Sequence, residues 1–219
     1  DDTRAHSARL LGALSLRCGD ADVFHGLIKE LGAVLAGKSG ILSQWYQKHG
    51  IVCGLAELLR GAAQHGAEQR ASLADAAGTA LVPVVQKESH EETRQLACST
   101  LGKWMLHSAA STALPSAVEA ALRAGLTNQK VAATPLLSAL NEMTSAREAT
   151  SAAKLEGLAD TLAALVETAQ KRPQASHPDA VVALCVWLRV GQACATVRSA
   201  GAASLKPGLA VAHPYLFSP

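Results

Sequence analysis

Apolar residues recur every three or four positions along nearly the whole chain, and the strict alternation typical of β-strands is absent. This spacing places apolar side chains on one face of an α-helix. Polar and glycine-containing breaks separate the stripes, so the pattern predicts about nine to ten helices of roughly 14 to 22 residues with short connections. The two clearest stripes are Phe24-Leu27-Ile28-Leu31-Val34-Leu35 and Leu155-Leu158-Leu162-Leu165-Val166-Ala169.

The breaks carry residues that commonly begin or end helices. Gly19 followed by Asp20 indicates a C-terminal glycine and then an N-cap, and Ser89 with Glu92 three residues later indicates a capping box. The run 171–173, Lys-Arg-Pro, indicates a basic last turn followed by a stop. These signals support short connections between amphipathic helices.

Helices of this kind pair, and the pairs repeat along the chain. If the odd-numbered helices begin near residues 3, 41, 90, 129 and 177, the period is roughly 40 to 50 residues, which is typical of HEAT and armadillo repeats. A basic residue, a small residue and a leucine recur at one spacing, as Arg9-Gly12-Leu16, Arg94-Ala97-Leu101, Lys130-Ala133-Leu137 and Arg198-Gly201-Leu205.

Two prolines, Pro83 and Pro135, lie inside apolar stripes, where proline bends a helix and suits a curved stack. The fold expected for residues 1–219 is therefore all-α, a single right-handed α-solenoid segment of about four to five HEAT/armadillo-like repeats. A compact helical bundle without repeats is the alternative.

Composition narrows the classes of protein. The chain is 49% hydrophobic but only 3% aromatic, which favours close-packed helices over a β-sandwich. Twenty basic and eighteen acidic residues nearly balance, so charge demands neither nucleic acid nor a membrane as partner. No apolar run of about eighteen residues and no signal-peptide pattern is present.

Five cysteines stand singly in apolar stretches: Cys18, Cys53, Cys98, Cys185 and Cys194. An odd number without a C-x-x-C pair indicates reduced, buried thiols and a cytosolic or nuclear protein. The chain begins with Asp1 and ends on an apolar, proline-containing segment, so we expect a fragment of a longer repeat protein.

One stretch suggests nucleotide chemistry. Gly32 and, five residues later, Gly37-Lys38-Ser39 match the P-loop pattern G-x-x-x-x-G-K-[ST]. A working P-loop follows a β-strand and precedes a helix, whereas an amphipathic helix over about 23–36 would hold Gly32 in its interior. We therefore expect Gly37 to end this helix and begin a turn.

The remaining motifs are incomplete. His90-Glu91-Glu92-Thr93-Arg94 lacks the second histidine of H-E-x-x-H, and His49 with Cys53 lacks further metal ligands. Ser151-x-x-Lys154 lacks the partner motifs of serine–lysine acylation and is better explained as a helix start. Trp45-Tyr46 and Trp104 lie on apolar stripes and are expected in the core. We assign no catalytic, cofactor-binding or metal-binding residue.

With the repeat in place, residues 11–58 and 81–127 resemble the N-terminal HEAT-repeat region of the general control non-derepressible activator family, and residues 158–171 fit further. The likeness covers roughly residues 5–195. It rests on "CGDAD" between helices, Pro83, His90-Glu91 and the helix around Trp104. Members of this family are large ribosome-associated scaffolds that activate the kinase of eukaryotic initiation factor 2.

The resemblance implies a non-enzymatic, cytoplasmic scaffold without cofactor, small-molecule substrate or membrane contact. Its expected partners are the ribosome and proteins of the initiation factor 2 alpha kinase pathway, including an ABC-type ATPase, in amino-acid starvation and stalled-ribosome signalling. The second hypothesis is another HEAT or armadillo scaffold, such as a transport receptor or adaptor subunit. The third hypothesis is a P-loop NTPase. The transport alternative predicts a ladder of exposed Trp and Asn on inner helices.

Overall fold

Every element in the described part of the chain is helical. The computed structural model describes residues 2–37, 44–108, 113–128, 132–145, 152–171 and 177–193. The helices are α1 (Asp2–Ser15), α2 (Ala21–Leu35), α3 (Trp45–Ala62), α4 (Ala67–Lys87), α5 (Glu91–Met105), α6 (Ser116–Thr127), α7 (Thr134–Ser145), α9 (Ala159–Lys171) and α10 (His177–Ala193), with a 3-10 turn, η1 (Glu156–Leu158), before α9. The all-α prediction is confirmed for these ranges.

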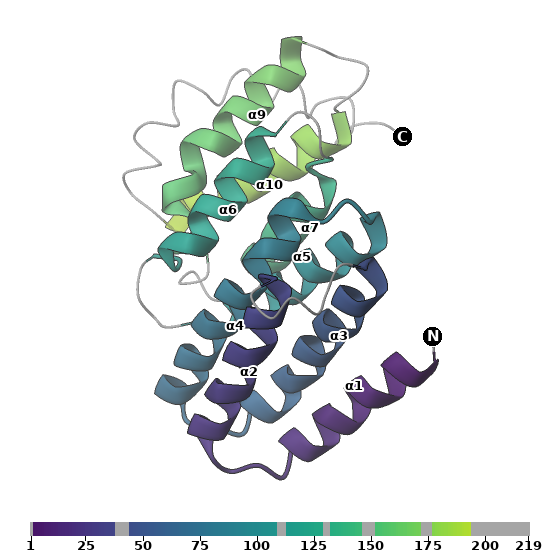
Figure 1. Ribbon diagram of the computed structural model, residues 1–219. Helices are drawn as coiled ribbons and strands as arrows, with labels where there is room; N and C mark the ends of the chain where they lie inside the picture. Colours follow the sequence, from purple (N-terminus) through teal and green to yellow (C-terminus); the bar gives the residue numbers. More distant parts are fainter. Residues whose placement is uncertain are drawn as a thin grey trace, which may run out of the picture.

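The helices form two layers, with each helix packed on the next one of its own layer. The first layer contains α1, α3, α5, α7 and α10 in that order, and the second contains α2, α4, α6 and α9. Contacts such as those between α4 and α5 and between α9 and α10 join the layers. Figure 1 shows the stack rising from α1 and α2 at one end to α9 and α10 at the other.

The first layer has the period that the sequence predicts. Its helices begin at residues 2, 45, 91, 134 and 177, so successive starts lie 43 to 46 residues apart. The expected starts near 3, 41, 90, 129 and 177 are confirmed to within five residues. Helices that follow one another in this layer are thus separated in sequence by one helix of the second layer.

The core runs between the two layers and consists mainly of Leu, Val and Ala. Trp104 of α5 is fully buried, as expected, and its Nε1 donates a hydrogen bond to the Leu55 carbonyl of α3 at 3.0 Å. Cys98 is also buried, and burial raises the pKa of its thiol to about 11. Cys18, Cys53 and Cys185 are only partly buried, and Cys194 lies outside the described residues.

A basic side chain in the first turn of a first-layer helix reaches the start of the next helix in that layer. Arg4 of α1 donates to the Tyr46 carbonyl at 3.1 Å, and Lys48 of α3 pairs with Glu88, just before α5, at 2.7 Å. Arg94 of α5 donates to the Ala132 carbonyl, just before α7, at 2.9 Å. These three residues, 44 and 46 positions apart, form a series that we call the basic ladder.

The repeating sequence signature overlaps this ladder only at Arg94. Arg94-Ala97-Leu101 is buried, and the small residue of the first copy, Gly12, is buried at a close contact with α3, where an added Cβ would lie 2.9 Å from the Glu57 Cβ. The leucine position is wrong for the first helix, because Leu16 is 43% exposed, and Arg9 is exposed as well. Lys130 and Arg198 lie outside the described residues. The basic position of the signature is wrong at α1, because the cation that contacts α3 is Arg4, about one and a half turns before Arg9.

Helix ends confirm one predicted cap and correct two others. The Asp20 carboxylate accepts hydrogen bonds from the backbone N–H groups of Asp22 and Val23 and so caps α2 as expected. The Ser89 capping box is wrong, because the N-cap of α5 is His90, whose Nδ1 accepts from the Thr93 N–H. The Gly19 expectation is also wrong, since Gly19 lacks the positive φ of a C-terminal glycine.

The two prolines differ in position. Pro83 lies inside α4, as expected. Pro135, by contrast, is the second residue of α7, so the expectation of a bend there is wrong. A first-turn residue needs no backbone N–H for an intrahelical bond, and proline therefore fits there without distortion.

We expect Arg94→Met to destabilise the fold by about 2–4 kcal/mol, because it leaves two carbonyl groups without their donor. Arg94 is 5% exposed and donates to the carbonyls of Val85, in the last turn of α4, and Ala132. Urea unfolding followed by circular dichroism gives the free energy of unfolding. Arg60→Met is the control, since Arg60 is exposed and should change that free energy by less than about 0.5 kcal/mol. Equal losses in the two variants would contradict the role of Arg94.

Candidate functional site

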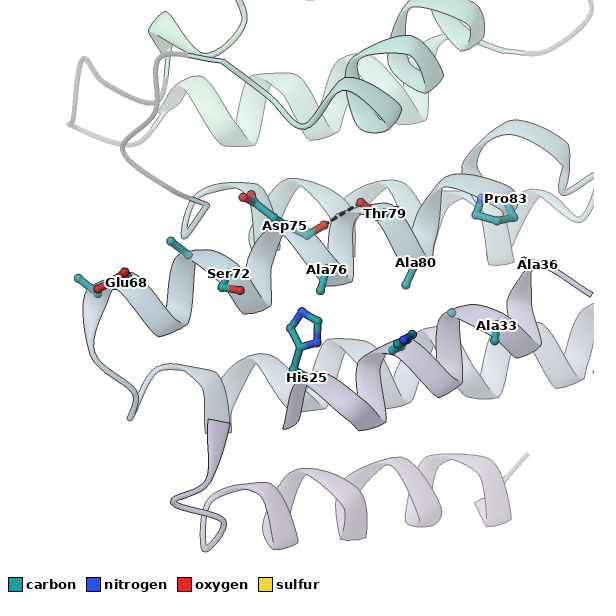
Figure 2. Close-up of a pocket in the computed structure, with 14 residues that line it drawn as sticks. His25, Ala33, Ala36, Glu68, Ser72, Asp75, Ala76, Thr79, Ala80 and Pro83 are labelled. Atoms are coloured by element: carbon teal, nitrogen blue, oxygen red, sulfur yellow. Dashed lines mark hydrogen bonds between the residues drawn. The ribbon is translucent and has the colours of Figure 1, made fainter. Parts of the chain in front are cut away.

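A hollow lies on the second layer, between α2 and α4. It has a volume of about 980 Å³ and runs along roughly four turns of α4. Figure 2 shows the two helices as its walls. Its lining is mostly small: Gly32, Ala33 and Ala36 from α2, and Ala67, Ala71, Ser72, Ala76, Thr79, Ala80 and Pro83 from α4, with His25, Lys29, Glu68 and Asp75 adding charge or polarity.

The two helices lie close together at Gly32. A Cβ atom on Gly32 would lie 2.8 Å from the Cβ of Ala80 and 3.2 Å from its Cα. Only a glycine fits at that distance without moving α4 away. A glycine–alanine contact between α2 and α4 therefore forms part of the α2–α4 groove.

The groove has basic groups on one wall and acidic groups on the other. His25 and Lys29 come from α2, and Glu68 and Asp75 come from α4. Burial raises the pKa of Asp75, an effect that the positive charge of Lys154 partly opposes. One carboxylate oxygen of Asp75, Oδ1, is buried without a hydrogen-bond partner, and Figure 2 shows this side chain directed away from His25.

The P-loop pattern falls beside this groove. Gly32 lies inside α2, as expected, and its contact with Ala80 keeps it there. Gly37 has a φ of +75° and its N–H donates to the Val34 carbonyl, so it ends the helix as expected. Lys38 and Ser39 lie outside the described residues. An α-helix therefore stands where a P-loop requires a strand and a loop.

A second surface gathers aromatic and basic side chains at the starts of α3 and α5. Trp45 and Tyr46 are 39% and 44% exposed, so the expectation that they lie in the core is wrong. Trp45 stacks on His90 with ring centroids 3.7 Å apart, and the Arg4 guanidinium lies 5.8 Å from the centroid of the Trp45 ring. The apolar stripe was misleading because these residues occupy the first turn of α3, at the end of the helix, where His90 covers one face of the Trp45 ring.

The incomplete motifs have structural contacts. His49 Nδ1 lies 3.2 Å from the Thr93 hydroxyl, and Cys53 is partly buried one turn further along α3. No group of three or more metal-ligating side chains occurs among the described residues.

The lysine of the serine–lysine motif has a structural role. Lys154 is 5% exposed and donates to the carbonyls of Met105 and Ser108 at the end of α5. Ser151 lies outside the described residues.

Comparisons of the chain with protein-family models, curated proteins and solved structures find no match. No described helix is long and apolar enough to cross a membrane. The class of protein must therefore be argued from the helical repeat and its surfaces.

We expect Gly32→Ala to destabilise the protein by about 1–3 kcal/mol, because the added methyl group forces α2 and α4 apart. Gly26→Ala is the matched control on the same helix, since a Cβ there would meet nothing within 4 Å. It should be neutral or stabilising by up to about 1 kcal/mol, because alanine favours a helix. Thermal unfolding of both variants measures the difference, and a Gly32→Ala variant as stable as Gly26→Ala would contradict the close contact.

Proposed function

We propose that this chain is a segment of a HEAT/armadillo-like α-solenoid and serves as a non-enzymatic scaffold for other macromolecules. The observation that carries the proposal is the pair of helical layers, in which first-layer helices recur every 43 to 46 residues. Such a stack grows by adding helix pairs and presents long surfaces rather than one enclosed site. The α2–α4 groove and the aromatic surface at Trp45 are two such surfaces.

Within this class, we propose the ribosome-associated activator family as the specific assignment. Its expected partners remain the ribosome, the proteins of the initiation factor 2 alpha kinase pathway and the ABC-type ATPase. The residues behind the resemblance have structural roles: Asp20 caps α2, Pro83 lies in α4, and Trp104 is in the core. They therefore support the shared helical repeat, while ribosome binding rests on the resemblance.

A transport receptor or adaptor scaffold is the second candidate. Its expected ladder of exposed tryptophans is missing, because Trp104 is fully buried and Trp187 is 7% exposed, which leaves only Trp45 of the three at the surface. The P-loop NTPase ranks third because Gly32 lies within α2. The first candidate is thus favoured over both.

We expect the purified chain to co-sediment with eukaryotic ribosomes in a saturable manner that excess unlabelled chain reverses. The net charge of +2 provides little general attraction for RNA, so binding should persist at physiological salt. Sucrose-cushion sedimentation with increasing chain concentration measures it, and a heat-unfolded sample of the same chain serves as control. Absence of saturable binding would contradict the ribosome assignment.

A further inference from the structure

The walls of the α2–α4 groove carry charged side chains of opposite sign. His25 and Lys29 lie one turn apart on α2, and Glu68 lies in the first turn of α4. All three residues are exposed. Within the described part of the chain, none of their side chains takes part in a hydrogen bond or an ion pair. These groups can therefore bind charges that a partner supplies.

The floor between the two walls is apolar and built from small residues. Ala71 and Ala80 of α4 are buried, Ala33 and Ala76 are half-buried, and Gly32 has no side chain. Figure 2 shows Ala76 and Ala80 on the side of α4 that faces α2. A floor of this kind leaves room for larger apolar side chains of an incoming segment. The groove thus combines an apolar floor with charged walls.

The size of the groove indicates the shape of its occupant. Along α4, the lining residues extend from Ala67 to Pro83, which corresponds to about 24 Å of helix. An α-helix with its side chains is roughly 10 Å across, so a helix of that length occupies about 1,900 Å³. The groove volume of about 980 Å³ is half of this value. A helix of about four turns, sunk to half its depth, would therefore fill the groove.

The charged walls determine which residues the edges of such a helix must carry. With its apolar face on the floor, one edge meets Lys29 and His25 and must carry carboxylates. The other edge meets Glu68 and must carry basic groups. Asp75 also belongs to α4, but Figure 2 shows its side chain directed away from His25. A helix with the same charge on both edges would be repelled by one wall.

A second copy of this chain does not supply a matching helix through its exposed leucines. These are Leu10 and Leu14 of α1, which are 60% and 58% exposed. Between Thr3 and Ser15 the sequence contains arginine but no acidic residue. An α1 helix in the groove would therefore bring no carboxylate to Lys29. The charges favour a helix from a different protein.

We infer that the α2–α4 groove binds an amphipathic α-helix of a partner protein, with acidic residues on the edge facing α2 and basic residues on the edge facing α4. Reversing a helix exchanges its two edges, so the same charges also fix the direction in which the helix lies. This inference rests on the proposed scaffold function and specifies one of its surfaces and the kind of partner.

Three synthetic peptides of about sixteen residues test the groove on the whole chain. They share one leucine-rich face and a staple on the opposite face that keeps them helical. The mixed peptide carries Glu on one edge and Lys on the other, the acidic peptide carries Glu on both, and the basic peptide carries Lys on both. By fluorescence anisotropy at pH 7.5 and low salt, we expect the mixed peptide to bind at least about threefold more tightly than either of the others.

Charge reversal of each wall should change this order in a defined way. Lys29→Glu makes both walls acidic, so the basic peptide should bind best. Glu68→Lys makes both walls basic, so the acidic peptide should bind best. The double variant Lys29→Glu/Glu68→Lys should again prefer the mixed peptide, which then lies in the opposite direction. High salt should reduce all of these preferences, because exposed charges are screened.

Matched controls make the same charge changes outside the groove. Lys87→Glu changes an exposed residue in the last turn of α4, and Glu91→Lys changes an exposed residue in the first turn of α5. Both variants should keep the wild-type order of the three peptides. Circular dichroism of every variant verifies that the helices are intact.

Several results would overturn the inference. They are the absence of saturable binding, equal affinities of the three peptides for the wild type, and an order that Lys29→Glu and Glu68→Lys leave unchanged. Sedimentation equilibrium provides a further check, since a dimer that Lys29→Glu or Glu68→Lys dissociates would show that a second copy occupies the groove. Ribosome co-sedimentation is measured separately, so failure of the groove and failure of the ribosome assignment are distinguishable.

Discussion

The arrangement of the first layer depends on how the start of one helix is tied to the start of the next. Arg4, Lys48 and Arg94 each lie in a first turn and reach a carbonyl or carboxylate ahead of, or at the start of, the following helix. Such a contact fixes how far two neighbouring helices are shifted along their axes relative to each other. The side chain can reach its partner group in only one such position. At the far end of the layer a different contact joins two helices: Arg189, near the end of α10, donates to Oδ1 of Asn141 of α7.

The basic ladder sets the axial position of neighbouring first-layer helices, and small side chains determine how close neighbouring helices lie. Gly32 lies against Ala80 in the second layer, and a Cβ on Gly102 of α5 would lie 3.0 Å from the Ala139 carbonyl oxygen of α7. Each contact lets two helix backbones approach closely. Alanine and leucine side chains then fill the space between the two helices. In the second layer, small side chains also line the α2–α4 groove and leave it open. The same small residues therefore allow the close helix packing and form the groove at the surface.

The sequence was sufficient for the helices and their period, because apolar spacing and caps such as Asp20 are local signals. It was insufficient for contacts between distant residues. The pairing of Arg4 with Tyr46, the groove wall from Gly32 to Ala80 and the exposure of Trp45 depend on which helices become neighbours. His90 displaced Ser89 as the cap of α5 because Glu88, held by Lys48, fixes the His90 backbone N–H.

The basic ladder couples successive helix pairs, and a double-mutant cycle on Lys48 and Glu88 tests this coupling most directly. Burial alone would raise the pKa of Glu88, but the bonds from Lys48 and the His90 N–H outweigh it and hold that pKa below its usual value. Urea unfolding at pH 7 of Lys48→Met, Glu88→Gln and the double variant gives the coupling free energy. We expect about 1–3 kcal/mol, since the Glu88 side chain is 4% exposed. A coupling below about 0.3 kcal/mol would contradict the claim.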